Sequence, residues 1–170
     1  PVRGEETGGG DASIANLPEQ SALAAAALQL CGPGATTAVH PTRVVVITPY
    51  AAQAVGLRTA LRTAGLPDIR VTTVDAMQGS EADVILLSTV RSGSRGWGFL
   101  HDKRRLNVAL SRARELLVVF THPRSLTELS VGGLIAARAD QRPDWTALRR
   151  SLCSGTGHGT MEGHHDDDSS

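Results

Sequence analysis

Three segments of the chain concentrate residue types that bind phosphate groups. The segments are ITPYAAQ (47–53), TTVDAMQGSEADVILLSTVRS (72–92) and GFLHDKRRLNVALSRAR (98–114). Hydroxyls such as those of Thr48 and Thr73 can donate hydrogen bonds to phosphate oxygens. Arg91 and Arg95 lie in a Gly/Ser-rich loop and can follow a phosphate backbone. These residues predict contacts with a ligand that carries phosphate groups.

Arg105 and Arg112 of the third segment have a spacing that suits chemistry on a phosphate. The sequence predicts a helix over 102–114 with Asp102 as its N-cap. Seven residues of helix turn through about 700°, so the two arginines would lie within roughly 20° on one face, two turns apart. Phosphoryl transfer requires positive charge at the transferring oxygens. One guanidinium would then reach the phosphate while the other lies further along the cleft that binds the ligand.

The charge is unevenly distributed, although the formal net charge is zero. Residues 91–150 carry twelve Lys or Arg against five acids, whereas residues 1–90 carry five against eight. Residues 151–170 carry four acids and no Lys or Arg. A basic segment between acidic ones favours a localised anionic ligand, and a solvated basic surface is the alternative.

The composition predicts one globular domain. The 170 residues are 41% hydrophobic and 20% charged, which excludes a wholly disordered chain. No apolar run approaches the roughly 18 residues of a membrane span, so we expect no membrane partner. Cys31 and Cys153 match neither a disulfide scaffold nor a metal-ligand spacing. We therefore expect a reducing, cytoplasmic compartment and no metal site in this chain.

Strand-like and helix-like segments alternate along the chain. We expect strands at 43–48, 69–74, 83–90 and 115–121, and helices at 18–30, 50–64, 102–114 and within 123–152. Residues 1–12 are expected to be a flexible leader, 13–152 the folded domain, and 153–170 a disordered acidic and His-containing tail. Because the strands are apolar throughout, they predict an α/β fold: a parallel sheet with helices on both faces. In such sheets function gathers at the carboxyl ends of the strands, where we expect the three polar segments.

In this order and spacing, the three segments resemble motifs IV, V and VI of superfamily 1 helicases. The pattern elements are TPY-x-x-Q, T-V-D-x-x-Q-G-x-E-x-D and R-R-L-N-V-A-L-S-R-A-R. They are closest to the branch that contains the nonsense-mediated mRNA decay helicase. The resemblance covers roughly residues 13–125 and includes Ser13, Asn16 and Glu19. It implies a RecA-like domain, the second of two motor domains that enclose ATP in the cleft between them.

The resemblance also implies roles for residues of motif VI. Arg112 corresponds to the arginine finger, and Arg105 to a cleft-lining or coupling residue. Arg104 and Arg114 are expected to be surface or interface residues.

Residues of motifs IV and V are expected to bind the nucleotide. Gly79 lets the backbone approach a ligand closely. By resemblance, Glu81 faces the nucleotide near its ribose or the finger, and an ordinary ion pair with a nearby Arg is the alternative. Gln78 is expected to link nucleotide and nucleic acid. Tyr50 is expected to stack on or cap the adenine side of the cleft, with packing beneath the helix as the alternative.

Two features of a complete motor are missing from the sequence. It contains neither a GxxxxGK[ST] phosphate loop nor an Asp-Glu pair after a strand. In the family the first motor domain supplies both, so that domain would hold Mg²⁺. We therefore expect this chain to be the second motor domain of an ATP-dependent helicase and to be unable to hydrolyse ATP by itself. Its partners would be single-stranded RNA or DNA and a first motor domain in the same or another chain. The alternative is a stand-alone, inactive pseudo-motor domain that binds nucleic acid or a protein.

Overall fold

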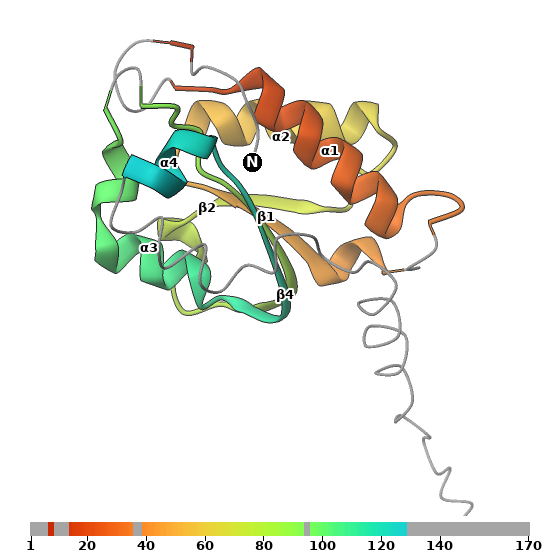
Figure 1. The fold of residues 1–170 in the computed structure, drawn as a ribbon. Helices are drawn as coiled ribbons and strands as arrows, with labels where there is room; N and C mark the ends of the chain where they lie inside the picture. Colours follow the sequence, from red (N-terminus) through yellow and green to blue (C-terminus); the bar gives the residue numbers. More distant parts are fainter. Residues whose placement is uncertain (1–6, 9–13, 36–38, 94–95, 129–170) are drawn as a thin grey trace, which may run out of the picture.

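Four parallel strands form the sheet in the order β2-β1-β3-β4 (Figure 1). The strands are β1 (Val44–Thr48), β2 (Arg70–Thr73), β3 (Ala82–Ser88) and β4 (Ala113–Phe120). Every neighbouring pair is parallel, which places the carboxyl ends of all four strands at one edge of the sheet. The predicted RecA-like α/β fold is confirmed.

The computed structural model describes residues 7–8, 14–35, 39–93 and 96–128. Most of the predicted leader, the expected helices beyond residue 128 and the predicted tail lie outside the described residues. Within the leader, Thr7 forms an isolated antiparallel bridge with Ala15, in which Thr7 N donates to Ala15 O at 2.7 Å.

Helices precede, connect and follow the strands, and α1 and α3 begin at side chains that cap them. They are α1 (Leu17–Cys31), α2 (Ala51–Thr63), α3 (Lys103–Leu110) and α4 (Pro123–Glu128), with 3-10 turns η2 (Pro41–Arg43), η3 (Asp75–Met77) and η4 (Gly98–His101). At the start of α1, Asn16 Oδ1 accepts a hydrogen bond from Glu19 N at 3.0 Å. At the start of α3, Asp102 Oδ1 accepts from the amides of Arg104 and Arg105, as its predicted N-cap role requires. None of the helices in the described part of the chain is long and apolar enough to cross a bilayer.

The sheet divides the hydrophobic core into two layers. Alternate residues of β1 point to opposite faces: Val44 and Val46 pack with α1 and α2, whereas Val45 and Ile47 pack with η3, η4 and α3. Strand β3 alternates in the same way. Because both faces are covered, these central strands need apolar residues on both sides of their middle, which is the pattern of residues 44–47 and 84–87.

The predicted helix over 102–114 is wrong at its C-terminal end. Helix α3 stops at Leu110, and Ala113 already belongs to β4. The amide of Ala82 donates to Arg112 O at 3.1 Å, and Ala82 pairs with Ala113. Pairing with β3 therefore overrides the helical propensity of residues 111–114. The expectation that Arg105 and Arg112 share one face of a continuous helix is wrong for the same reason.

We predict that Leu57→Ala destabilises the domain by about 2–5 kcal/mol, because Leu57 is fully buried between α2 and the sheet. Val55→Ala on the same helix is the control, since 60% of Val55 is exposed. Urea unfolding followed by circular dichroism measures both free energies of unfolding. Equal losses in the two variants would contradict the assigned face of α2.

Candidate functional site

The candidate residues lie at both edges of the sheet. Thr48 and Thr73 end β1 and β2, and Arg91 follows β3, so these three lie at the carboxyl edge. Glu81 and Arg112 immediately precede β3 and β4, which places them at the amino edge. The expectation that all three motifs gather at the carboxyl ends is therefore wrong. Motifs V and VI start near the carboxyl edge and run back to the opposite one.

Arg112 lies at the junction between α3 and β4 with its side chain folded onto the helix end. Its Nε donates to Val108 O at 2.9 Å, and its Nη2 donates to Ser111 Oγ at 3.0 Å. A guanidinium is a suitable partner for the carbonyls and the negative dipole end of a helix C-terminus. Nη1 makes no hydrogen bond within the described residues. The side chain is thus anchored through Nε and retains donors for an anion.

Gly79 and Glu81, separated by Ser80, lie on the approach to β3. Gly79 has φ 78°, and a Cβ added there would meet no atom within 4 Å, so the turn is open to solvent. Glu81 Oε2 accepts a hydrogen bond from Arg114 Nε at 3.1 Å. Both side chains are about half exposed or more. Glu81 therefore has the arginine partner that the alternative interpretation anticipated, and it also remains accessible to a ligand.

Arg105 is engaged by Asp75 near the carboxyl edge. Its Nε and Nη2 donate to the two carboxylate oxygens at 3.0 and 2.7 Å, which is a bidentate pair. The guanidinium also lies 5.3 Å from the ring centroid of Phe99. Gln78 is exposed and lines a hollow of about 170 Å³ between η3 and α3, together with Asp75 and Arg105. This pair ties motif V to motif VI.

Tyr50 and Arg91 are buried against one another. Arg91 Nε donates to Tyr50 Oη at 2.9 Å, and the amide of Phe99 donates to the same oxygen at 3.2 Å. Only 6% of Tyr50 and 4% of Arg91 is exposed. For Tyr50 this geometry favours the packing alternative over stacking on adenine. Arg91 would have to leave Tyr50 to meet a phosphate. Arg95 lies outside the described residues.

The two threonines differ in accessibility. Thr48 is fully buried, and its Oγ1 has no hydrogen-bond partner within the described residues. Thr73 is partly exposed, and its Oγ1 accepts from Ala76 N at 3.4 Å. Thr73 can therefore meet a ligand directly, whereas Thr48 can do so only if its neighbours move.

A buried polar network behind the carboxyl edge was missed by the sequence reasoning. Glu19 Oε2 accepts from Ser88 Oγ at 2.6 Å and from Val90 N at 2.9 Å. Gln53 Nε2 donates to Ser88 Oγ at 2.9 Å, while Asn16 Nδ2 donates to Val90 O at 2.9 Å. Val90 has φ 71°, a costly conformation for a β-branched residue.

These bonds hold the strained turn that leads from β3 into the Arg91 loop. The signal in the sequence was the spacing Asn16-x-x-Glu19 together with Gln53 of TPY-x-x-Q. The motifs contained these residues, but their contacts join α1, α2 and the end of β3, which lie far apart in the sequence.

Comparison with known proteins gives relatives that align with about half of this chain. The regulator of nonsense transcripts 1 homolog of Arabidopsis thaliana is 43% identical over 97 residues, which is 53% of this chain and 8% of the relative. The ATP-dependent helicase NAM7 of Saccharomyces cerevisiae is 43% identical over 95 residues, 52% of this chain and 10% of the relative. Helicase sen1 of Schizosaccharomyces pombe is 45% identical over 89 residues, 49% of this chain and 5% of the relative. The aligned region is thus a tenth or less of each relative's length.

A family model described as an AAA domain (AAA_12) matches residues 2–124. The match includes all three motif segments and all four strands of the sheet. Together with the relatives, it confirms the resemblance to the second motor domain of superfamily 1 helicases. Because the matched residues make up most of the chain, this protein belongs to the AAA domain family.

Proposed function

We propose that this chain is the second motor domain of an ATP-dependent superfamily 1 helicase and supplies its arginine finger, Arg112. The observation that carries the proposal is that Arg112 and Glu81 directly precede the paired first residues of β4 and β3 at the amino edge, within a segment that the family match covers. The relatives named as helicases support ATP-driven work on nucleic acid. In the proposed motor, ATP binds between this edge and a first motor domain.

Arg112 would act on the charge that develops as the γ-phosphoryl group departs. Its Nε bond to Val108 O holds the guanidinium at the end of α3, and its Nη1 can donate to phosphate oxygens. A group held in place before the reaction stabilises the transition state without a cost of reorganisation. Glu81 would accept hydrogen bonds from the nucleotide, near its ribose or the finger. Gly79 would let the backbone approach the nucleotide.

The carboxyl edge would carry the single strand. Thr73 offers an accessible hydroxyl for phosphate, and Thr48 and Arg91 lie behind it as buried groups. In the proposal Arg95 extends this track along the Gly/Ser-rich loop. Helix α3 spans the distance between the carboxyl edge, which would carry the single strand, and the amino edge, which would face the nucleotide. Arg105 at its start and Gln78 across from it would couple the two.

The rest of the reaction requires the first motor domain. The sequence holds no phosphate loop, and within the described ranges no three His, Cys, Asp or Glu side chains gather to hold a metal ion. We assign Mg²⁺ to the partner domain, in the same or another chain. Single-stranded RNA and DNA both fit the proposal, because phosphate contacts carry no sequence information. Because the two cysteines match no disulfide scaffold, the proposal includes a reducing, cytoplasmic compartment.

In the motor assembled with its first domain, Arg112→Ala should lower kcat by roughly 10³ to 10⁵, the usual effect of an arginine finger. ATP affinity should change little, because the guanidinium acts mainly in the transition state. Arg112→Lys should recover little activity, since an ammonium lacks the planar fork of donors. The measurements are steady-state ATPase and nucleotide affinity.

The control for this series is Arg62→Ala. Arg62 is an exposed arginine in the last turn of α2, on the other face of the sheet, and its loss removes the same charge. Full turnover by Arg112→Ala, or an equal loss in Arg62→Ala, would refute the finger assignment. An inactive wild-type pair that still binds single strands would instead favour the pseudo-motor alternative.

The isolated chain should show no ATPase above background and should bind single strands weakly and without sequence preference. About two to four phosphate contacts, at roughly −0.7 each, give an expected log–log salt slope of about −1.4 to −2.8. Fluorescence anisotropy across a salt series measures this slope. A flat response would contradict the proposed phosphate track, and so would tight sequence-specific binding.

A further inference from the structure

Strand β4 carries a bulge where it begins. Ala82 pairs with Ala113, yet Val84 pairs with Leu116, so two residues of β4 lie opposite Asp83 alone. Those two residues are Arg114 and Glu115. Bulges bend a strand and redirect side chains, and they occur often beside functional sites. This one lies immediately after the proposed arginine finger.

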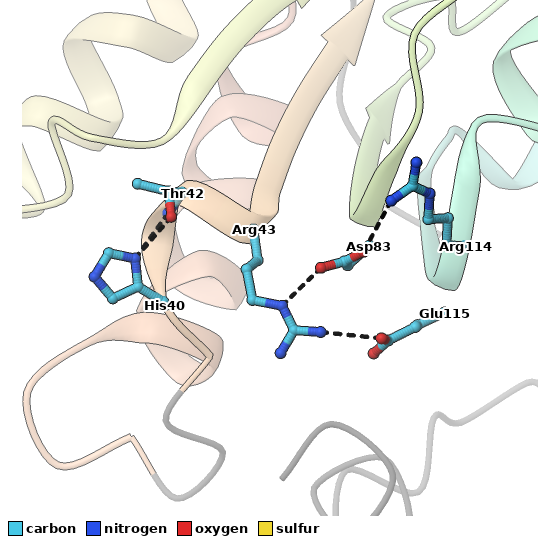
Figure 2. Close-up of polar contacts among 6 residues, drawn as sticks. All are labelled: His40, Thr42, Arg43, Asp83, Arg114 and Glu115. Atoms are coloured by element: carbon cyan, nitrogen blue, oxygen red, sulfur yellow. Dashed lines mark hydrogen bonds and ion pairs between the residues drawn. The ribbon is translucent and has the colours of Figure 1, made fainter. Parts of the chain in front are cut away.

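Arg43, the last residue of η2, bridges the bulge (Figure 2). It precedes β1, and its Nε donates to Asp83 Oδ2 at 2.7 Å while its Nη2 donates to Glu115 Oε1 at 3.0 Å. About a quarter to a third of each of these side chains is exposed. The hydrogen bond with Asp83 raises the pKa of Arg43 above its ordinary value. One guanidinium therefore joins the starts of β1, β3 and β4.

Arg114 extends this bridge to motif V. Its Nε donates to Glu81 at 3.1 Å, and its Nη1 lies 3.9 Å from Asp83 Oδ1, on the side away from Arg43 (Figure 2). At the amino edge, five side chains thus form a chain of ion pairs in which acids and arginines alternate. In order of contact they are Glu81, Arg114, Asp83, Arg43 and Glu115. The Glu81–Arg114 pair alone is too exposed to hold a fixed geometry, because ion pairs between solvent-exposed side chains contribute little to stability.

We propose that Arg43 and Arg114 are positioning residues for the nucleotide edge. Arg43 pins the β4 bulge through Asp83 and Glu115, and the pinned bulge holds Arg114 where it can orient the Glu81 carboxylate. Arg112 leaves α3 just before the same bulge, so its backbone is fixed by the same bridge. The proposal rests on the proposed function, because it takes Glu81 and Arg112 as nucleotide contacts.

The first test uses the chain alone and amide hydrogen exchange. The amide of Ala82 donates to Arg112 O at the amino end of the β3–β4 pair, and that of Thr89 donates to Phe120 O at the other end. Arg43→Met should speed exchange at Ala82 roughly tenfold, about the equivalent of one net hydrogen bond, and leave Thr89 unchanged. Arg43→Lys should recover part of the protection, because an ammonium can still meet one of the two carboxylates.

The control variant is Arg124→Met. Arg124 forms an ion pair with Glu128 at 2.7 Å within α4, which follows the carboxyl end of β4 and so lies at the far end of that strand from the bulge, and its loss should leave both amides unchanged. Equal acceleration at Ala82 and Thr89 in Arg43→Met would show a merely global loss of stability and would overturn the proposal. No acceleration at Ala82 would overturn it as well.

The second test uses the assembled two-domain motor. Arg43→Met and Arg114→Gln should raise KM for ATP on the order of tenfold with a smaller change in kcat, because a misplaced Glu81 weakens nucleotide binding in ground and transition states alike. An unchanged KM beside an inactive Arg112→Ala would overturn the positioning role and leave the proposed function standing. Full turnover by Arg112→Ala would overturn the proposed function and, with it, the nucleotide half of this inference.

Discussion

The pairing of β4 with β3 is the constraint on which the rest of this structure depends. It ends α3 at Leu110, places Arg112 at the amino edge and joins Ala82 to Arg112 by a backbone hydrogen bond. The same pairing brings Thr89 and Phe120 together at the opposite edge. Local propensity would allow the helix to continue through residues 111–114. The hydrogen bonds and apolar contacts of a buried strand outweigh that preference.

Helix α3 then becomes the physical connection between the carboxyl edge and the amino edge of the sheet. Asp102 caps its start near the carboxyl edge, where the bidentate pair of Arg105 and Asp75 ties it to motif V. Arg112 closes its other end through Val108 O. A helix held at both ends moves as one body. In the proposed motor, a shift at the carboxyl edge would therefore reach the amino edge, as the coupling of ATP hydrolysis to movement along a single strand requires.

The sequence predicted the elements whose signal is local. The β-branched runs located all four strands to within one or two residues, and Asp102 identified the start of α3. The motif order indicated the family before any geometry was known. These features depend on residue type and spacing alone, and both can be read directly from the chain.

The features that the sequence did not predict depend on contacts between distant segments. Nothing local indicates that Arg91 turns inward onto Tyr50, because an arginine in a Gly/Ser-rich loop is compatible with full exposure. Arg43 belongs to no motif, and its role follows only from the strand starts that the sheet brings together. The prediction that Arg105 and Arg112 share one helix face was wrong for the same reason, because the pairing of β4 with β3 decides where α3 ends.

We propose that Arg112 acts on the transition state of ATP hydrolysis and not on nucleotide binding in general. The direct measurement is calorimetric titration of the assembled motor with ADP alone and with ADP plus aluminium fluoride, a mimic of the transferring phosphoryl group. We predict that Arg112→Ala binds ADP as the wild type does and loses most of the additional affinity that aluminium fluoride confers. Unchanged affinity for the mimic, or an equal loss for both ligands, would contradict the account.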